Sequence, residues 1–281
     1  MHVDVAPLPL DEPRAVTLDA SMTPQGYEAA ILDYLRDVAN RVARSAGVES
    51  EWIILTGDVP QALERLALDA GADLIALASH DRSALGRLVA GSLGERIVRE
   101  SGLPVLLVTK SDEQLKMERE ADPATVFDPI SGPPAVFRHV LVPLDGSPLA
   151  EVVLEPASRF ARATGARITL LTVSNPAQLQ RWPPDFATGD YLEEIARSLR
   201  AAGIVADVVV LESRDVAKEI LDAVTDLSAD VIAMATHGRG GLSRLLQGSI
   251  AANVVHSVLM PVLLVRPEAA KRLSAAEPRH A

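Results

Sequence analysis

The residues best suited to chemistry form a loop of small and polar residues between positions 235 and 249. Ala235 is followed after two residues by Gly238, and nine further residues lead to Gly248-Ser249. The loop follows the buried-strand pattern Asp230–Met234 and runs into a helical pattern. Small residues let a ligand approach the backbone closely, and the free N–H groups and dipole at a helix start favour an anion. The spacing therefore predicts a loop that holds phosphate.

Polar side chains in and near this loop extend the hypothesis. Ser249 offers a hydroxyl donor, and His237 and Arg239 could meet phosphate charge. Asp145, in Pro143–Ser147, follows another strand pattern and could accept a hydrogen bond from a ribose hydroxyl or a base amine. Simpler interpretations stay open: Asp145 as a turn and helix cap, His237 as an exposed loop residue, and Arg239 as a solvated charge.

Other signatures of chemistry are missing from the sequence. It has no Gly-Lys-Ser/Thr of a Walker loop and no Gly-x-Gly-x-x-Gly dinucleotide fingerprint. No His, Asp and Glu cluster has a convincing metal spacing. The serines lack a nucleophile elbow, and the loop contains no obvious base to activate water. We therefore predict no catalytic residue and no metal site.

Composition narrows the class of protein. The chain has 281 residues, a formal net charge of −11, 48% apolar residues and no cysteine. The negative charge argues against general affinity for nucleic acid or anionic membranes, and the lack of cysteine excludes thiol chemistry. No signal-peptide pattern or bilayer-length apolar run is present. We expect a soluble cytoplasmic protein.

A repeat organises the chain. Asp73–His80 aligns with Asp230–His237, and Pro104-Val-Leu-Leu-Val108 recurs unchanged as Pro261–Val265, always 157 residues later. The predicted domains are an incomplete unit over residues 1–109 (repeat 1), a linker over 110–136, a complete unit over 137–267 (repeat 2), and a tail over 268–281.

Repeat 2 alternates strand and helix patterns, which predicts a parallel sheet. Its expected strands are Phe137–Leu144, Arg167–Val173, Val205–Leu211, Asp230–Ala235 and Val262–Val265. Its expected helices are Leu149–Thr164 with a bend at Pro156, Asp190–Ala202, a helix from Asp215 to Leu227, and Leu245–Val258.

Repeat 1 follows the same pattern but lacks the first strand and first helix. Its expected helices cover Tyr27–Ser45, a segment capped by Asp58, and Leu88–Glu100. Its expected strands are His2–Ala6, Trp52–Leu55, Leu74–Ala78 and Val105–Val108. The fold class is therefore α/β, with two doubly wound, flavodoxin- or Rossmann-like units.

In these features the sequence resembles the universal stress protein family in its tandem form. The motifs that carry the resemblance are Val140–Ser147, Ala235–Gly241, Gly248–Ala251 and Pro261–Val265. The resemblance implies the strand order 3-2-1-4-5 and pairing of units through their last strands, here Val105–Val108 with Val262–Val265. The ATP-binding branch of the family uses a Gly-x-x-Gly-x9-Gly-Ser/Thr loop, in which Ala235 here replaces the first Gly.

Carried onto this sequence, the family's nucleotide site would use Pro143, Asp145 and Val173 on the adenosine side and Gly238, Gly248, Ser249 and Ile250 at ribose and phosphate. The complete set of candidate cofactor-binding residues is Pro143, Leu144, Asp145, Val173, Met234, Ala235, His237, Gly238, Arg239, Gly248, Ser249, Ile250 and Ala251. In repeat 1, Asp81 replaces the second Gly and Asp145 has no counterpart, so we expect one site, in repeat 2.

The sequence thus favours a tandem universal stress protein that binds ATP, with or without Mg²⁺, and acts as a regulatory or protective factor. One alternative is a slow ATPase, and another is a structural pairing module without a nucleotide. The expected partners are an adenine nucleotide and the other unit of the same chain. A homodimer stays open, and neither nucleic acid nor a membrane is expected.

Overall fold

The computed structural model describes residues 24–55, 57–79, 93–109, 136–174, 188–236, 250–258, 260–267 and 269. The chain forms two compact bodies. The small body contains Met1–Gly57 and Asp112–Ala135, and the large body contains Asp58–Ser111 and Val136–Ala281. The predicted strand His2–Ala6, the linker and the loop 237–249 lie outside the described residues.

In the small body, the described part consists of helix α1 and the segment that follows it. Helix α1 covers Pro24–Ala46 and confirms the predicted helix Tyr27–Ser45. The predicted strand Trp52–Leu55 is wrong: these residues form no strand, and Ile54 is exposed. An apolar, β-branched run forms a strand only where a neighbouring strand accepts its backbone hydrogen bonds, and none of the described strands pairs with this segment.

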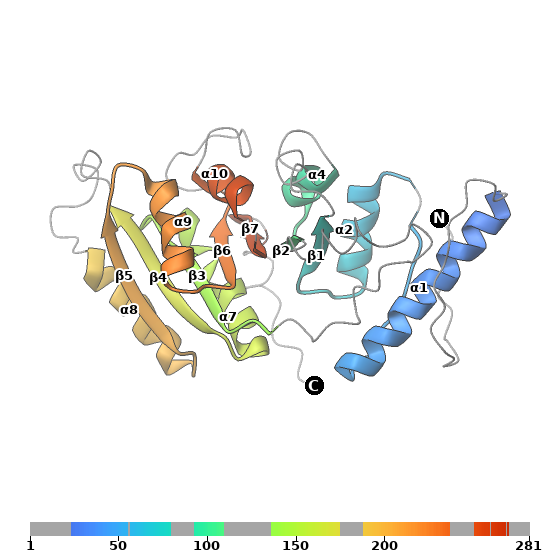
Figure 1. The fold of residues 1–281 in the computed structure, drawn as a ribbon, viewed down its shortest axis with the longest axis horizontal. Helices are drawn as coiled ribbons and strands as arrows, with labels where there is room; N and C mark the ends of the chain where they lie inside the picture. The colour runs from blue at the N-terminus through green and yellow to red at the C-terminus, as the bar shows by residue number, and fades with distance from the viewer. Residues whose placement is uncertain are drawn as a thin grey trace. The chain divides into compact units, whose positions relative to one another are not determined.

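The large body is built on one sheet in the order β1-β2-β7-β6-β3-β4-β5 (Figure 1). Every strand pair is parallel except β2 with β7. Within it, β5-β4-β3-β6-β7 is repeat 2 in the predicted order 3-2-1-4-5, so the fold class is confirmed. The strands are β1 (Ile75–Ser79), β2 (Val105–Thr109), β3 (His139–Pro143), β4 (Arg167–Ser174), β5 (Ala206–Glu212), β6 (Val231–Ala235) and β7 (Val262–Val265).

The two repeats share this sheet through an antiparallel seam between β2 and β7. Val105 lies opposite Leu264 and Leu107 lies opposite Val262. The predicted pairing of the last strands is therefore present within one chain. Because the seam joins strands of both repeats, the two compact bodies divide the chain differently from the repeat boundaries.

The helices begin largely where the sequence places their caps. The side chains of Asp58, Ser147 and Asp215 each accept a hydrogen bond from a backbone N–H in the first turn. The described helices of the large body are α2 (Val59–Asp69), α4 (Leu93–Glu100), α6 (Pro148–Glu151), α7 (Leu154–Thr164), α8 (Thr188–Ala201), α9 (Val216–Asp226) and α10 (Ile250–Ser257).

The predicted helix Leu149–Thr164 is broken into α6 and α7 at Val152–Val153. Pro156 has no N–H to donate to the carbonyl of Val152, so the regular ladder cannot cross this point. The sequence predicted a bend, and the structure has a short interruption. Helix α7 then ends at Gly165, whose φ of 72° is a left-handed conformation that glycine adopts without strain.

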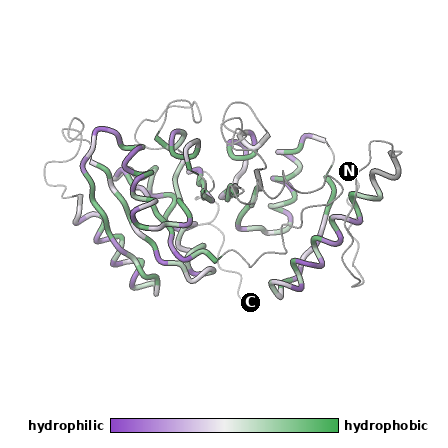
Figure 2. Tube along the Cα trace, viewed as in Figure 1, coloured by the Kyte–Doolittle hydropathy of each residue, from purple (hydrophilic) through white to green (hydrophobic). Residues whose placement is uncertain are grey.

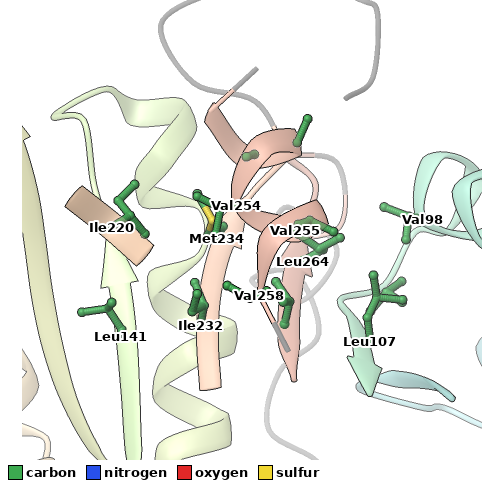
Figure 3. Packing of buried hydrophobic residues seen from close by; sticks show 14 of the residues in the cluster. Val98, Leu107, Leu141, Ile220, Ile232, Met234, Val254, Val255, Val258 and Leu264 are labelled. Carbon is green, nitrogen blue, oxygen red and sulfur yellow. The ribbon is translucent and has the colours of Figure 1, made fainter. Parts of the chain in front are cut away.

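Apolar residues fill both faces of the sheet. Helices α2, α4, α9 and α10 contribute to one cluster, and α6, α7 and α8 contribute to the other. Figure 2 shows long green, hydrophobic stretches on the strands and alternating colours on the helices. Figure 3 shows Leu141, Ile232 and Leu264 of three strands pointing toward the same side as α10 residues Val254 and Val258. Burial on both faces agrees with the low polarity of the parallel strands.

Candidate functional site

Strands β3 and β6 lie side by side at the point where the strand order reverses. After β3 the chain continues to β4 on one side, while β6 and β7 lie on the other side. Both neighbours of β3 are parallel to it, with Val140 opposite Val231 and Pro143 opposite Leu171. The carboxyl ends of the three strands therefore meet at one edge, which is where doubly wound sheets bind ligands.

The predicted site residues that the structure describes gather at this edge in four segments. They lie at the end of β3, the end of β4, the end of β6 and the first turn of α10. Helix α10 starts at the same edge because it connects the parallel strands β6 and β7 and must run back between them. These residues are Pro143, Leu144, Asp145, Val173, Met234, Ala235, Ile250 and Ala251. The predicted residues His237, Gly238, Arg239, Gly248 and Ser249 lie outside the described residues.

The four segments differ in what their side chains can offer. Leu144, Met234 and Ala251 are buried in the apolar clusters, so a ligand at this edge would meet their backbone. Met234 belongs to the same apolar cluster as Val254 of α10, and both are labelled in Figure 3. Four side chains are partly exposed, those of Pro143, Asp145, Val173 and Ala235. Ile250 is more exposed, at 44%.

Asp145 is fixed in a tight turn between β3 and α6. Its Oδ1 accepts hydrogen bonds from the backbone N–H of Ser147 at 3.0 Å and from the Ser147 hydroxyl at 2.6 Å. Between them, Gly146 has a φ of 70°, which a turn of this kind requires. The Ser147 Oγ also accepts the N–H of Ala150 at 3.2 Å and caps α6. The Asp145–Ser147 segment therefore has the turn-and-cap role that the sequence left open: Asp145 stabilises the turn, and Ser147 is the helix cap.

The backbone before Asp145 is held by strand β4. The Leu144 N–H donates to the carbonyl of Leu171 at 2.8 Å, and the Thr172 hydroxyl donates to the carbonyl of Leu144 at 2.9 Å. Sequence reasoning missed Thr172, which is 1% exposed. The available signal was a hydroxyl residue inside the otherwise apolar stretch Leu170–Val173.

The end of β6 is anchored in a similar way to β7. Ala235 lies opposite Val265, and the N–H of Thr236 donates to the carbonyl of Val265 at 2.9 Å. Thr236 is buried and is the second residue of the predicted phosphate loop. The described start of that loop is thus attached to the sheet on the side away from β3.

A buried titratable group of repeat 2 with a lowered pKa lies at the opposite edge of the sheet. His139 starts β3 and is 3% exposed. Burial, followed by the nearby Arg167 guanidinium, lowers the pKa of His139 below its ordinary 6.5, although the carbonyl of Leu227 and the carboxylates of Asp230 and Asp207 oppose this. His139 therefore belongs to the stability of the fold and not to the candidate site.

Two further features are absent from the described residues. None of their His, Asp and Glu residues form a group of three that could hold a metal ion. None of their helices has the length and apolarity needed to cross a bilayer.

The mostly parallel sheet, whose order reverses between β3 and β6, places the chain in the class of doubly wound α/β proteins. Comparison with known proteins identifies the family: the model for the universal stress protein family matches residues 3–109 and 137–266, and the chain belongs to this family in its tandem form. The resemblance noted in the sequence is confirmed.

Individual relatives agree with this assignment. A universal stress protein of Mycobacterium tuberculosis is 28% identical over 231 residues, covering 79% of this chain and 70% of the relative. One from Thermus aquaticus is 31% identical over 144 residues, covering 47% of this chain and 100% of the relative. A crystal structure of a universal stress protein from Archaeoglobus fulgidus has the same fold, with a TM-score of 0.57, 22% identity, and coverage of 87% of this chain and 80% of that chain.

A further solved universal stress protein is in complex with cAMP. It is 22% identical to this chain, covers 47% of it and 98% of its own length, and has a TM-score of 0.38.

Proposed function

We propose that repeat 2 binds an adenine nucleotide, with ATP as the expected ligand, at the edge between β3 and β6. The observation that carries the proposal is the placement of Asp145 and Ala235 at the carboxyl ends of two adjacent parallel strands, on either side of the switch point. Membership of a family in which a relative has been solved with cAMP agrees with a nucleotide as the ligand.

The residues at this edge fit the chemistry of a nucleotide. An ionised carboxylate accepts hydrogen bonds and does not donate them, so Asp145 suits a base amine or a ribose hydroxyl. Pro143, Val173 and Ile250 offer partly exposed apolar surface for a base or sugar. Gly248 and Ser249 precede α10 in the sequence and would present N–H groups and a hydroxyl to the phosphates.

The cellular role that we propose is a regulatory or protective factor in a stress response whose state depends on nucleotide occupancy. The nucleotide supplies binding energy and charge, and this proposal assigns no bond-breaking step to the protein. Hydrolysis is a separate hypothesis, for which His237 is the candidate side chain. Phosphate release that disappears in His237→Ala with ATP affinity retained would establish it.

The first experiment identifies the ligand. Mass spectrometry of nucleotide released from the purified chain, followed by calorimetry with ATP in the presence and absence of Mg²⁺, tests binding directly. We expect ATP to bind to the wild-type chain. If no adenine nucleotide binds under any of these conditions, the protein is a structural pairing module and the proposal is wrong.

A pair of substitutions at Asp145 then tests the site. Asp145→Asn keeps an amide oxygen that can accept from Ser147 but replaces the other carboxylate oxygen by a donor. Loss of a hydrogen bond to a charged group corresponds to about 10- to 100-fold weaker ATP binding. Asp215→Asn is the matched control, because Asp215 also accepts a backbone N–H at a helix start, from Lys218 at 3.1 Å, but belongs to α9. Equal affinity of the Asp145 and Asp215 variants would contradict the assignment.

A substitution in the loop tests the phosphate side. We expect Gly248→Val to block ATP binding, because a branched side chain would stand where a phosphate must approach the helix start. Gly189→Val is the control, since a Cβ at Gly189 meets nothing within 4 Å. Unchanged ATP affinity of the Gly248 variant in calorimetry would remove the loop from the site.

A further inference from the structure

Two hydroxyl side chains from different elements hold the turn that carries Asp145. Ser147 belongs to the turn itself and donates to the Asp145 carboxylate. Thr172 lies on β4 and donates to the carbonyl of Leu144, the residue directly before Asp145. The turn is therefore fixed at both ends of the Asp145 residue by groups that need not touch a ligand.

The Thr172 bond replaces a strand bond at the point where β3 leaves the sheet. Up to Pro143, which lies opposite Leu171, β3 is paired with β4 by backbone groups. The N–H of Leu144 still donates to the carbonyl of Leu171, but the Leu144 carbonyl bonds to the Thr172 side chain. A backbone carbonyl as buried as this requires a donor, and the hydroxyl supplies it while the chain turns away toward Asp145.

The position of Thr172 in its strand marks a change from apolar to polar side chains. Ile168 and Leu170, on the same face of β4, belong to the apolar cluster under α6, α7 and α8. Thr172 and Ser174 follow at the same period of two residues, and each hydroxyl donates to a backbone carbonyl, of Leu144 and of Leu211. The hydroxyls thus lie at the end of β4 that faces the candidate site.

We propose that Thr172 is a positioning residue for Asp145: together with Ser147 it holds the Leu144–Ser147 turn in the geometry in which the Asp145 carboxylate meets the nucleotide. This inference rests on the proposed nucleotide site in repeat 2. The inference assigns to Thr172 a role in nucleotide affinity, although the Thr172 side chain lies under the turn and contacts the backbone of the turn.

The chain offers a matched control in Thr169. This residue is on the same strand, is 2% exposed, and makes one short side-chain contact, 2.7 Å from its Oγ1 to the Nε2 of His139 at the opposite edge of the sheet. Thr172→Val and Thr169→Val remove the same hydroxyl from equally buried positions with the same change of shape. We expect both substitutions to lower the thermal stability, but only Thr172→Val to act on the Asp145 turn.

The experiment measures ATP affinity by calorimetry in a double-mutant cycle with Asp145→Ala. We expect Thr172→Val to weaken ATP binding about tenfold, the worth of one hydrogen bond, and to have no further effect in the Asp145→Ala background. Thr172→Ser retains the hydroxyl and should bind within about twofold of wild type, as should Thr169→Val. In the ligand-free protein, amide exchange at residues 144–147 should increase in Thr172→Val and stay unchanged in Thr169→Val.

A second variant guards against failure of Thr172→Val to fold. Ser147→Ala removes the hydroxyl that donates to Asp145 and also removes the cap of α6, whereas Asp215→Ala removes only a cap, that of α9. Of these two variants, we expect only Ser147→Ala to weaken ATP binding. In the Asp145→Ala background, Ser147→Ala should have no further effect.

The outcomes separate this inference from the proposed function. If Thr172→Val binds ATP with wild-type affinity, the inference is wrong and the proposed function stands. The same holds for Ser147→Ala if Thr172→Val does not fold, and for an additive effect in the Asp145→Ala background. A wild-type chain that binds no adenine nucleotide overturns the proposed function, and the inference with it.

Discussion

Ala76 of β1 and Ala233 of β6 occupy the same position of the two repeats, 157 residues apart, yet Ala233 is fully buried and Ala76 is exposed. Their surroundings explain the difference. β6 lies between β3 and β7, and α6 and α7 contribute to the cluster on the face of Ala233. β1 pairs with β2 and is the last described strand at its edge of the sheet. Identical sequence patterns thus give a central strand in repeat 2 and an edge strand in repeat 1.

This asymmetry predicts unequal local stability. Amides of Ile75–Ser79 should exchange with solvent roughly tenfold or more faster than those of Val231–Ala235, because an edge strand opens without disrupting two neighbours. Hydrogen exchange followed by mass spectrometry compares the two strands within one sample. Equal protection would mean that the outer side of β1 is as well covered as β6.

The seam between the repeats is the second feature with a direct test. Leu107 and Leu264 are 3% and 2% exposed and belong to one apolar cluster that includes residues of α4 and α10. Replacing both by Lys places two charges in this cluster, which we expect to cost more than about 4 kcal/mol of unfolding free energy. Urea unfolding and small-angle scattering measure the loss of stability and compactness.

The control for the seam is Val210→Lys on β5, at a side chain that is 43% exposed. A surface substitution of this kind should change stability by less than about 0.5 kcal/mol. If the Leu107 and Leu264 double variant is as stable and compact as this control, the β2–β7 pairing does not hold the repeats together.

His139 predicts a loss of stability at mildly acidic pH. Its Nδ1 lies 3.0 Å from the carbonyl oxygen of Leu227 and 3.1 Å from Arg167 Nη2, in a buried position. Because its pKa is lowered below 6.5 in the folded state, the fold favours the neutral ring. The contribution is fully present above about pH 6.5 and decreases as the pH falls below the unfolded value.

The measurement is the urea midpoint between pH 7.5 and 5.5, a window chosen above the range where carboxylates titrate. We expect wild type to lose stability toward pH 5.5 more steeply than His139→Asn, which is less stable at pH 7.5 but has no ring to protonate. Parallel pH profiles for the two proteins would show that His139 is not the group responsible.

Much of the fold was predictable because its signals are local. Each helix start at Asp58, Ser147 and Asp215, and the helix end at Gly165, depends on one residue whose type suits the local conformation. The strand order of repeat 2 followed from the family resemblance, and the division into two units followed from the repeat. The predicted strand Trp52–Leu55 failed because strand formation depends on a neighbour that the segment's own residues do not encode.

The candidate site was predictable only in part. Asp145 and Ala235 stand in recognisable motifs directly after strand patterns, so their shared edge follows from a parallel sheet. The hydrogen bond from Thr172 to Leu144 joins residues 28 positions apart, and the contacts of His139 involve residues 30 and 88 positions away. Such pairs appear only once strand register is known, which periodicity does not give.

The two repeats should differ in ligand capacity, which gives the final prediction. Asp81 stands in repeat 1 where repeat 2 has Gly238, and a carboxylate near phosphates is repulsive. We therefore expect about one ATP per chain, and no binding in Gly238→Asp. Asp81→Gly should leave the stoichiometry at one, since repeat 1 also lacks a counterpart of Asp145. Calorimetry gives both values; two equivalent sites in wild type, or full ATP affinity in Gly238→Asp, would contradict a single site in repeat 2.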